Sequence, residues 1–96
     1  MLDSATRSAL SSLAKDAVTL HLGKGGPSEA LAVQLESLLD AHELVKLRFI
    51  DFKDEKRAIS ESLAERCSCE LVRVLGHTAI FFRRNPDPDK RKVLLP

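Results

Sequence analysis

The spacing of apolar residues switches repeatedly between a helical and a strand period, and this switching constrains the fold more than any other feature of the sequence. The helical period predicts three helices: residues 4–17, residues 27–41, and a third from Asp51 or Asp54 to about residue 68. The alternating period predicts four strands: residues 18–22, 44–50, 70–75 and 78–83. The predicted element order is therefore αβαβαββ.

Each predicted helix has one apolar face. Asp3 is the expected N-cap of the first helix, whose apolar stripe consists of Leu10, Leu13, Ala14 and Ala17. The second helix starts at Pro27 and Ser28 and has Leu31, Leu35, Leu38 and Leu39 on one side. In the third helix the apolar positions are Ile59, Leu63 and Cys67.

The four strands predict a mixed sheet. Two right-handed strand-helix-strand crossovers make the first three strands parallel. Gly76-His77 fits a type II′ turn, because its first central residue needs a positive φ that glycine adopts cheaply. The last strand therefore runs antiparallel to the third. We predict an α/β fold in which helices pack on a four-stranded mixed sheet.

The chain has 96 residues, enough for one hydrophobic core and too few for two. We predict one domain over residues 1–84 and a C-terminal tail over residues 85–96, which starts with Asn-Pro-Asp-Pro-Asp. No leader pattern and no run of the ~18 apolar residues needed to cross a bilayer is present. We expect a cytoplasmic protein that is a monomer when free.

The segment between the first strand and the second helix, Gly23-Lys24-Gly25-Gly26, is the first candidate site. Backbone N–H groups at a helix start attract anions, glycines allow a phosphate to approach closely, and Lys24 adds a cation. The spacing Gly23-x-x-Gly26 also matches the loop with which KH domains hold a nucleic-acid backbone. The same glycines are equally compatible with a simple tight turn. The segment fits neither the Walker nor the dinucleotide-binding pattern, so ATP and NAD are not expected.

The polar face of the sheet is the second candidate site. The formal net charge is only +1, so an argument for nucleic-acid binding must depend on where the cations lie. Alternation places Lys46, Arg48, Arg73 and Arg83 on one face, near the glycine loop, if the second and third helices cover the other face. The alternative is a solvated sheet face. Phe81 shares the face of Arg83 and is either a stacking platform for a base or a core residue.

Other chemistry has weaker support. Cys67 and Cys69 lack the second ligand pair that zinc motifs have, and Cys67 falls on an apolar helix face, which favours a buried thiol. No base oriented by a third group is evident for Cys-His catalysis. We therefore expect no metal, no cofactor and no enzymatic activity. The basic residues 90–92 either extend an RNA surface or lead an apolar end, residues 93–96, onto the domain.

Four segments in order resemble the YhbY-like bacterial members of the CRM (chloroplast RNA splicing and ribosome maturation) domain family. They are residues 20–26 (Leu-His-Leu-Gly-Lys-Gly-Gly), 40–46 (Asp-Ala-His-Glu-Leu-Val-Lys), 71–77 (Leu-Val-Arg-Val-Leu-Gly-His) and 92–96 (Lys-Val-Leu-Leu-Pro). With the element order, they cover nearly the whole chain. The first helix departs from the family pattern, because it contains only Arg7 and Lys15, and Asp16-Ala17 replaces a Lys-Pro pair.

The resemblance implies an RNA-binding fold similar to the C-terminal domain of translation initiation factor three. It also implies association with precursors of the large ribosomal subunit, and an RNA surface that includes Gly23, Lys24 and Gly26. We expect an RNA-binding assembly factor in which Gly23, Lys24, Gly25 and Gly26, with Lys46, Arg48, Arg73 and Arg83, contact phosphates. A protein-interaction module that recruits a translation or ribosome factor without RNA contact is the alternative.

Overall fold

The computed structural model describes residues 2–93, and residues 94–96 of the predicted tail lie outside the described part. Its regular elements are α1 (Ser4–Leu13), β1 (Val18–Leu22), α2 (Glu29–His42), β2 (Leu44–Phe49), α3 (Lys56–Arg66), β3 (Glu70–Leu75) and β4 (Thr78–Phe82). Short 3-10 turns follow α1 (Ala14–Asp16), precede α3 (Lys53–Glu55) and lie in the C-terminal segment (Pro88–Lys90). The predicted order αβαβαββ is confirmed. No helix within residues 2–93 is long and apolar enough to span a bilayer.

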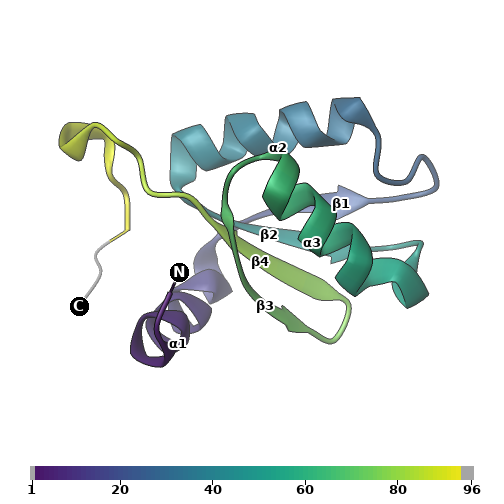
Figure 1. The fold of residues 1–96 in the computed structure, drawn as a ribbon, viewed down its shortest axis with the longest axis horizontal. Helices are drawn as coiled ribbons and strands as arrows, with labels where there is room; N and C mark the ends of the chain where they lie inside the picture. The colour runs from purple at the N-terminus through teal and green to yellow at the C-terminus, as the bar shows by residue number, and fades with distance from the viewer. Residues whose placement is uncertain (1, 94–96) are drawn as a thin grey trace.

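The four strands form one mixed sheet in the order β1-β2-β4-β3 (Figure 1). β1 pairs parallel with β2, and β4 pairs antiparallel with both β2 and β3. The predicted strand directions are confirmed. The hairpin turn is also as predicted, because Gly76 has a φ of 58° and His77 does not have a positive φ. β1 and β3 are consequently the two edge strands.

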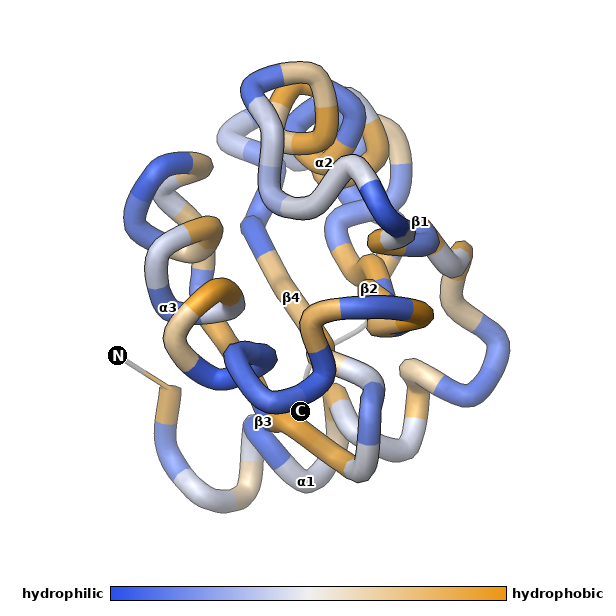
Figure 2. Tube along the Cα trace, turned by 90° about the vertical axis from the view of Figure 1, so that its right-hand side faces the viewer, coloured by the Kyte–Doolittle hydropathy of each residue, from blue (hydrophilic) through white to orange (hydrophobic). Residues whose placement is uncertain are grey.

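Helices cover both faces of the sheet, but unequally. α2 and α3 lie on one face, and α1 lies on the other (Figure 2). The larger core, between the sheet and α2 and α3, includes Leu35, Leu39, Val45, Phe49 and Phe81. The smaller core, under α1, consists of Leu10, Ala14, Leu44, Val72, Ile80, Phe82 and Val93. Of the two roles considered for Phe81, the core role is confirmed.

The helix ends differ in part from the sequence-based expectations. Asp3 caps α1 as predicted, its Oδ1 accepting the Thr6 N–H at 2.8 Å. α1 itself ends at Leu13, whose side chain is 45% exposed, so this residue does not join the predicted apolar stripe. Neither Asp51 nor Asp54 caps α3, because a 3-10 turn precedes it and Asp51 accepts the N–H of the adjacent Phe52.

Glu43 connects α2, β2 and the C-terminal segment. It is fully buried and has a φ of 65°, at the point where the chain reverses from α2 into β2. Its carboxylate accepts the backbone N–H groups of Asn85 (2.6 Å), Lys92 (2.7 Å) and Val93 (3.0 Å). The Arg84 guanidinium donates to the same carboxylate at 3.3 Å. The C-terminal segment is therefore fixed to the domain as far as Val93, which packs in the smaller core.

The environment of Glu43 favours its ionised form. Burial is the largest single influence and raises the pKa, but the backbone N–H groups of Asn85, Val93 and Lys92 and the charge of Arg84 together outweigh it. The pKa of Glu43 is therefore lowered. A carboxyl whose pKa is lower in the folded state stabilises the fold above its unfolded pKa, and this stabilisation is lost as the pH falls through the folded pKa.

We expect Glu43→Gln to lower the free energy of unfolding at pH 7 by about 2 kcal/mol, because hydrogen bonds to a buried charge are lost. Urea unfolding between about pH 7 and pH 3 measures this. Between about pH 5 and pH 3 the wild type should lose more stability than the variant, since only the wild type has the carboxyl to protonate. Glu65→Gln, at an exposed position on α3, is the control. Equal stability of Glu43→Gln and wild type at pH 7 would contradict the prediction.

Candidate nucleic-acid interface

α1 covers only one half of its sheet face and leaves the other half open. The covered half consists of Leu44, Val72, Ile80 and Phe82. Beyond it, strand register aligns one cross-sheet row, His21–Arg48–Thr78–Leu75, and a second row, Thr19–Lys46–Ile80–Arg73. In the first row Leu75 is 54% exposed, and His21 and Arg48 are exposed too. We call these two rows, without Ile80, which is buried under α1, the open half-face.

Three of the four cations predicted for the polar face lie on the open half-face: Lys46, Arg48 and Arg73. Arg48 and Arg73 are exposed, and Lys46 is half-buried with its Nζ donating to the Lys15 carbonyl oxygen at 3.2 Å. The condition for this arrangement is met, because α2 and α3 both pack on the opposite face.

The fourth cation, Arg83, is not on this face, and its predicted placement there is wrong. β4 ends at Phe82, and Phe82 and Ile80 point toward α1, so Arg83 falls on the side of Phe81, toward α2 and α3. There its guanidinium donates to the Cys67 carbonyl oxygen (2.7 Å) and to the carboxylate of Asp40 (2.7 Å). Arg83 therefore connects α2 to the end of α3.

The glycine loop, residues 23–26, is a closed turn with an exposed tip. The Gly26 N–H donates to the Gly23 carbonyl oxygen at 3.0 Å, and Lys24 and Gly25 are exposed. A Cβ at Gly23 or Gly25 would have no neighbour within 4 Å. At Gly26, which has a φ of 67°, a Cβ would lie 3.0 Å from the Phe52 ring. Gly26 is therefore structural, whereas the space beside Gly23 and Gly25 is open.

The loop does not itself begin α2. Ser28 is the N-cap, its Oγ accepting the Leu31 N–H at 3.1 Å, and the first helical residue is Glu29. Pro27 and Ser28 thus separate the glycines from the helix, and an acidic residue occupies the first turn. The predicted start of this helix at Pro27 and Ser28 is therefore corrected to Glu29, because Ser28 is the cap and Pro27 precedes it.

Two other loops lie beside the glycine loop. The N–H groups of Ile50 and Asp51 donate to the Leu22 carbonyl oxygen at 2.9 and 3.2 Å. The Phe49 N–H donates to the His77 carbonyl oxygen at 2.8 Å, which joins the β3–β4 turn to the same end of the sheet. The three loops therefore lie together at one end of the sheet, at the right of Figure 1.

The cysteines and histidines do not form a metal site. Within the described residues, no group of three or more His, Cys, Asp or Glu side chains is arranged to hold a metal ion. Cys67 is fully buried, as its position on the apolar helix face predicted, and its Sγ–H donates to the Ala32 carbonyl oxygen at 3.7 Å. Burial raises the pKa of both thiols, that of Cys69 to about 12, so both are protonated at neutral pH.

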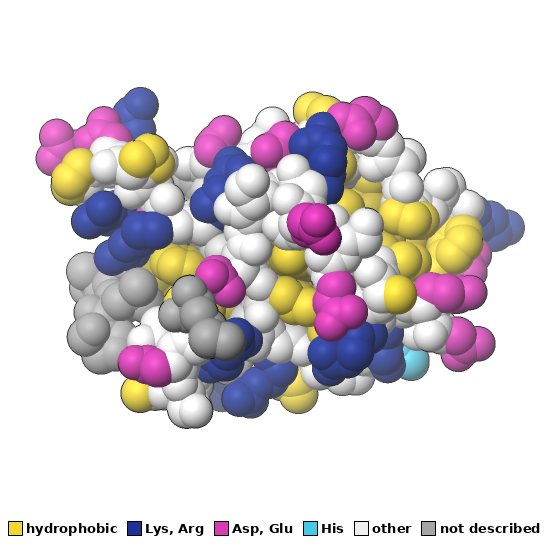
Figure 3. Space-filling model, viewed as in Figure 1, with side chains coloured by type: hydrophobic (Ala, Val, Ile, Leu, Met, Phe, Trp, Pro, Cys, Tyr) yellow, Lys and Arg dark blue, Asp and Glu magenta, His cyan; other side chains and the backbone are white. Residues whose placement is uncertain are grey.

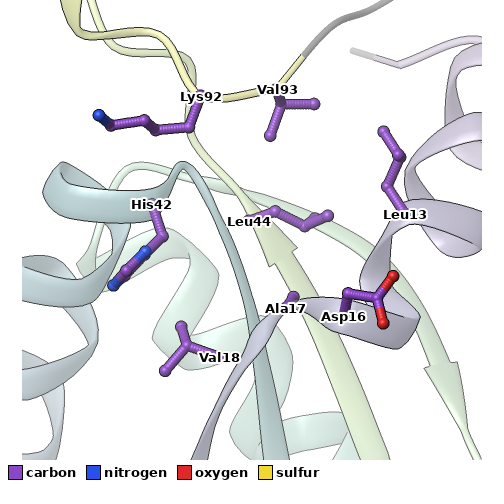
Figure 4. A pocket seen from close by; sticks show the side chains of 8 residues that line it. All are labelled: Leu13, Asp16, Ala17, Val18, His42, Leu44, Lys92 and Val93. Atoms are coloured by element: carbon purple, nitrogen blue, oxygen red, sulfur yellow. The ribbon is translucent and has the colours of Figure 1, made fainter.

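A separate cleft of about 320 Å³ lies between the end of α1, the start of β1 and the C-terminal segment (Figure 4). Apolar side chains predominate, and the polar groups around it belong to Asp16, His42 and Lys92. In Figure 4 the Asp16 carboxylate and the His42 imidazole lie on opposite sides and point away from each other. They do not form an acid–base pair.

Comparison with known proteins agrees with this architecture. Residues 2–83 match the model of the CRS1 / YhbY (CRM) domain. The chain belongs to this family. "Probable RNA-binding protein PA4753" of Pseudomonas aeruginosa is 32% identical over 72 residues, which are 74% of this chain and 69% of that protein. "Probable RNA-binding protein YqeI" of Bacillus subtilis is 25% identical over 77 residues, 79% of this chain and 78% of that one.

A solved structure has the same fold. The solution structure of SAV1595 from Staphylococcus aureus, a hypothetical protein described as a candidate RNA-binding protein, superposes with a TM-score of 0.79. The two chains are 30% identical, and the match covers 100% of each. The resemblance inferred from four sequence segments is thereby confirmed, as is the fold class. The likeness to the C-terminal domain of translation initiation factor three stays a prediction.

Two residues have defined roles that were not predicted from the sequence. Glu43 was noted only as part of the segment 40–46, although its carboxylate holds the C-terminal segment. Arg7 was noted only as one of few cations in the first helix, yet its Nη1 donates to the carbonyl oxygens of Leu71 (2.9 Å) and Val72 (2.6 Å). The only signal for Glu43 was its place between a helix and a buried strand, and Arg7 had none.

The glycine loop offers a matched pair of substitutions. We expect Gly26→Ala to cost about 1–2 kcal/mol of unfolding free energy, because an L-residue there adopts a left-handed conformation, and its Cβ also presses on Phe52. Gly25→Ala should change stability by less than about 0.5 kcal/mol, since it is an exposed change without new contacts. Urea unfolding of the two variants measures both values. Equal losses would show that the two glycines do not differ in their structural role.

Proposed function

We propose that this protein binds structured RNA, holding the phosphate backbone with the glycine loop and the open half-face, and that it is not an enzyme. The observation behind this proposal is the unequal distribution of paired and unpaired cations. It is supported by membership of the CRM family and by relatives whose names describe RNA binding.

On the α2 side of the molecule, positive charge is neutralised within the fold. Arg66 pairs with Glu29 and Glu36, Arg83 pairs with Glu36 and Asp40, and Arg84 pairs with Glu43. Figure 3 shows Lys and Arg side chains interspersed with Asp and Glu side chains over this surface. A polyanion gains little there, because each of these guanidinium groups already has a carboxylate beside it.

On the open half-face and in the glycine loop, by contrast, the cations have no carboxylate partners within residues 2–93. The guanidinium groups of Arg48 and Arg73 have no hydrogen bond or ion pair to any residue in the described range 2–93, and neither has the Lys24 ammonium group. Within the same residues Lys46 bonds to a backbone carbonyl oxygen and to no carboxylate, so its charge is not neutralised there. When these four cations bind phosphates, the counterions condensed on the RNA are released. This release favours binding without base specificity.

The glycine loop is suited to the same backbone. Its tip has no side chains at Gly23 and Gly25 that would hinder a phosphate, and Lys24 lies between them. Glu29 in the first turn of α2 lies near, but Arg66 is paired with it. We assign Gly23, Lys24, Gly25, Lys46, Arg48 and Arg73 to the RNA surface, with Gly26 as the residue that shapes the loop.

We further propose that the RNA belongs to a precursor of the large ribosomal subunit, for which the protein acts as an assembly factor. The support for this target is the resemblance to the YhbY-like members of the family. The C-terminal segment, residues 85–93, is proposed as a structural extension of the domain, because Glu43 holds it in place.

Three substitutions that each remove one positive charge test the RNA surface. We expect Lys24→Gln and Arg48→Gln each to weaken binding to a labelled ribosomal RNA stem-loop about three- to tenfold, and to reduce the salt slope by about 0.7–0.9. Arg66→Gln, the control, removes a cation whose charge is already paired and should change affinity less than about twofold. Fluorescence anisotropy over a range of salt concentrations gives both quantities. Equal effects of all three variants would contradict a localised surface.

Crosslinking in cells tests the target. We expect RNA fragments crosslinked to the protein to be enriched in precursors of the large-subunit ribosomal RNA, and the protein to leave the ribosomal fractions after ribonuclease treatment. Crosslinked RNA without ribosomal enrichment would exclude the proposed target but not RNA binding. Persistence of a large complex after ribonuclease, without crosslinked RNA, would instead favour a protein-interaction module.

A further inference from the structure

A second basic surface lies along the outer edge of β3, the sheet edge opposite β1. A groove of about 550 Å³ runs along this edge between α1 and α3. Three arginines from different elements line it: Arg7 of α1, Arg57 of α3 and Arg73 of β3. Figure 3 shows Lys and Arg side chains gathered along the lower margin of the molecule, below α3, where β3 and α1 lie.

The edge of β3 is blocked against the addition of another strand. The ladder between β3 and β4 shifts register between Leu71 and Arg73, and this irregularity bends the edge. At the same point Arg7 occupies the carbonyl oxygens of Leu71 and Val72. An edge whose acceptors are filled by a side chain does not suit an extended peptide. The groove therefore suits a ligand that is recognised by its charge.

The arginines of the groove have unused hydrogen-bonding capacity. The guanidinium groups of Arg57 and Arg73 form no hydrogen bond or ion pair within the described part of the chain. The two bonds of Arg7 both come from Nη1, which leaves its Nε and Nη2 donors available. Guanidinium groups bind phosphate oxygens through two parallel N–H groups, so the three residues form a set suited to phosphates.

We propose that the β3-edge groove is a second phosphate-binding site for the same RNA, with Arg57 as its main new contact. This inference rests on the proposed function. Arg73 belongs both to the open half-face, in the same cross-sheet row as Thr19 and Lys46, and to the groove. One RNA backbone thus runs from the glycine loop across the open half-face and over β3 to Arg57.

Because Glu61 also lines the groove, substitutions there can be tested both for weaker and for stronger RNA binding. It lines the same groove one helical turn after Arg57, and no ion pair joins the two side chains. A carboxylate there repels phosphates. We expect Arg57→Gln to weaken binding of a labelled RNA stem-loop about threefold and to lower the salt slope by about 0.7–0.9, and Glu61→Gln to strengthen binding by a similar factor.

Two controls on the same helix separate a local effect from a change in net charge. Arg66→Gln and Glu65→Gln repeat the two charge changes outside the groove, and each should alter affinity less than its partner variant does. All four positions are exposed, so urea unfolding should show the variants to be folded. Anisotropy titrations of the full chain over a range of salt concentrations provide the affinities.

The outcomes also distinguish this site from the proposed function. If wild type binds RNA and Lys24→Gln weakens binding, but Arg57→Gln and Glu61→Gln match their controls, the β3-edge groove is not a phosphate site, while the proposed function stands. If wild type does not bind the RNA even at low salt, both fail. Opposite shifts for Arg57→Gln and Glu61→Gln, each larger than its control, support the groove.

Discussion

The burial of β4 on both faces is the constraint from which the rest of the structure follows. β4 lies between β2 and β3, and its residues alternate between the two cores, Ala79 and Phe81 toward α2 and α3, Ile80 and Phe82 toward α1. A strand of this kind requires cover on both sides, because each exposed apolar side chain loses the free energy of its burial. Two helices supply the cover on one side. On the other side α1 is short and covers only the half near Phe82, so the same sheet has a closed half and an open half.

The open half is usable for binding because the charges are sorted by the same architecture. Glu29, Glu36 and Asp40 on α2, and Glu43 just after it, pair with Arg66, Arg83 and Arg84. The arginines of β2 and β3 face away from α2 and have no such partners within residues 2–93. The net charge of +1 therefore does not reveal that the cations are paired on one surface and unpaired on another. Bulk charge is a poor guide to nucleic-acid binding when the cations of one surface are paired with carboxylates and those of another are not.

Local signals in the sequence predicted local structure well. Alternation correctly placed Lys46 and Arg48 on the sheet face opposite to that of Val45 and Leu47. The Asp3 cap was also correct, and a loop that begins with glycine predicted the β3–β4 turn. Long-range features were not predictable in this way. The insertion of β4 between β2 and β3 depends on which strands can pair once all helices are placed. The side of Arg83 could have been derived from that of Phe81, since alternation puts both on one face, but the ion pairs of Arg83 depend on the helices that pack there.

Glu43 is a buried charge that no sequence pattern predicted, yet it fixes the position of the C-terminal segment. Its carboxylate replaces the strand or helix partners that the N–H groups of Asn85, Lys92 and Val93 lack, so an irregular segment is held without secondary structure of its own. A buried ionised carboxylate is costly unless several donors and a cation surround it, and here three N–H groups and Arg84 do so. The Glu43 backbone also accepts the Arg83 N–H. The end of β4 and the C-terminal segment are thus fixed by one residue. As a result, Val93 completes the core under α1, and the position of α1 in turn determines how much of the sheet stays open.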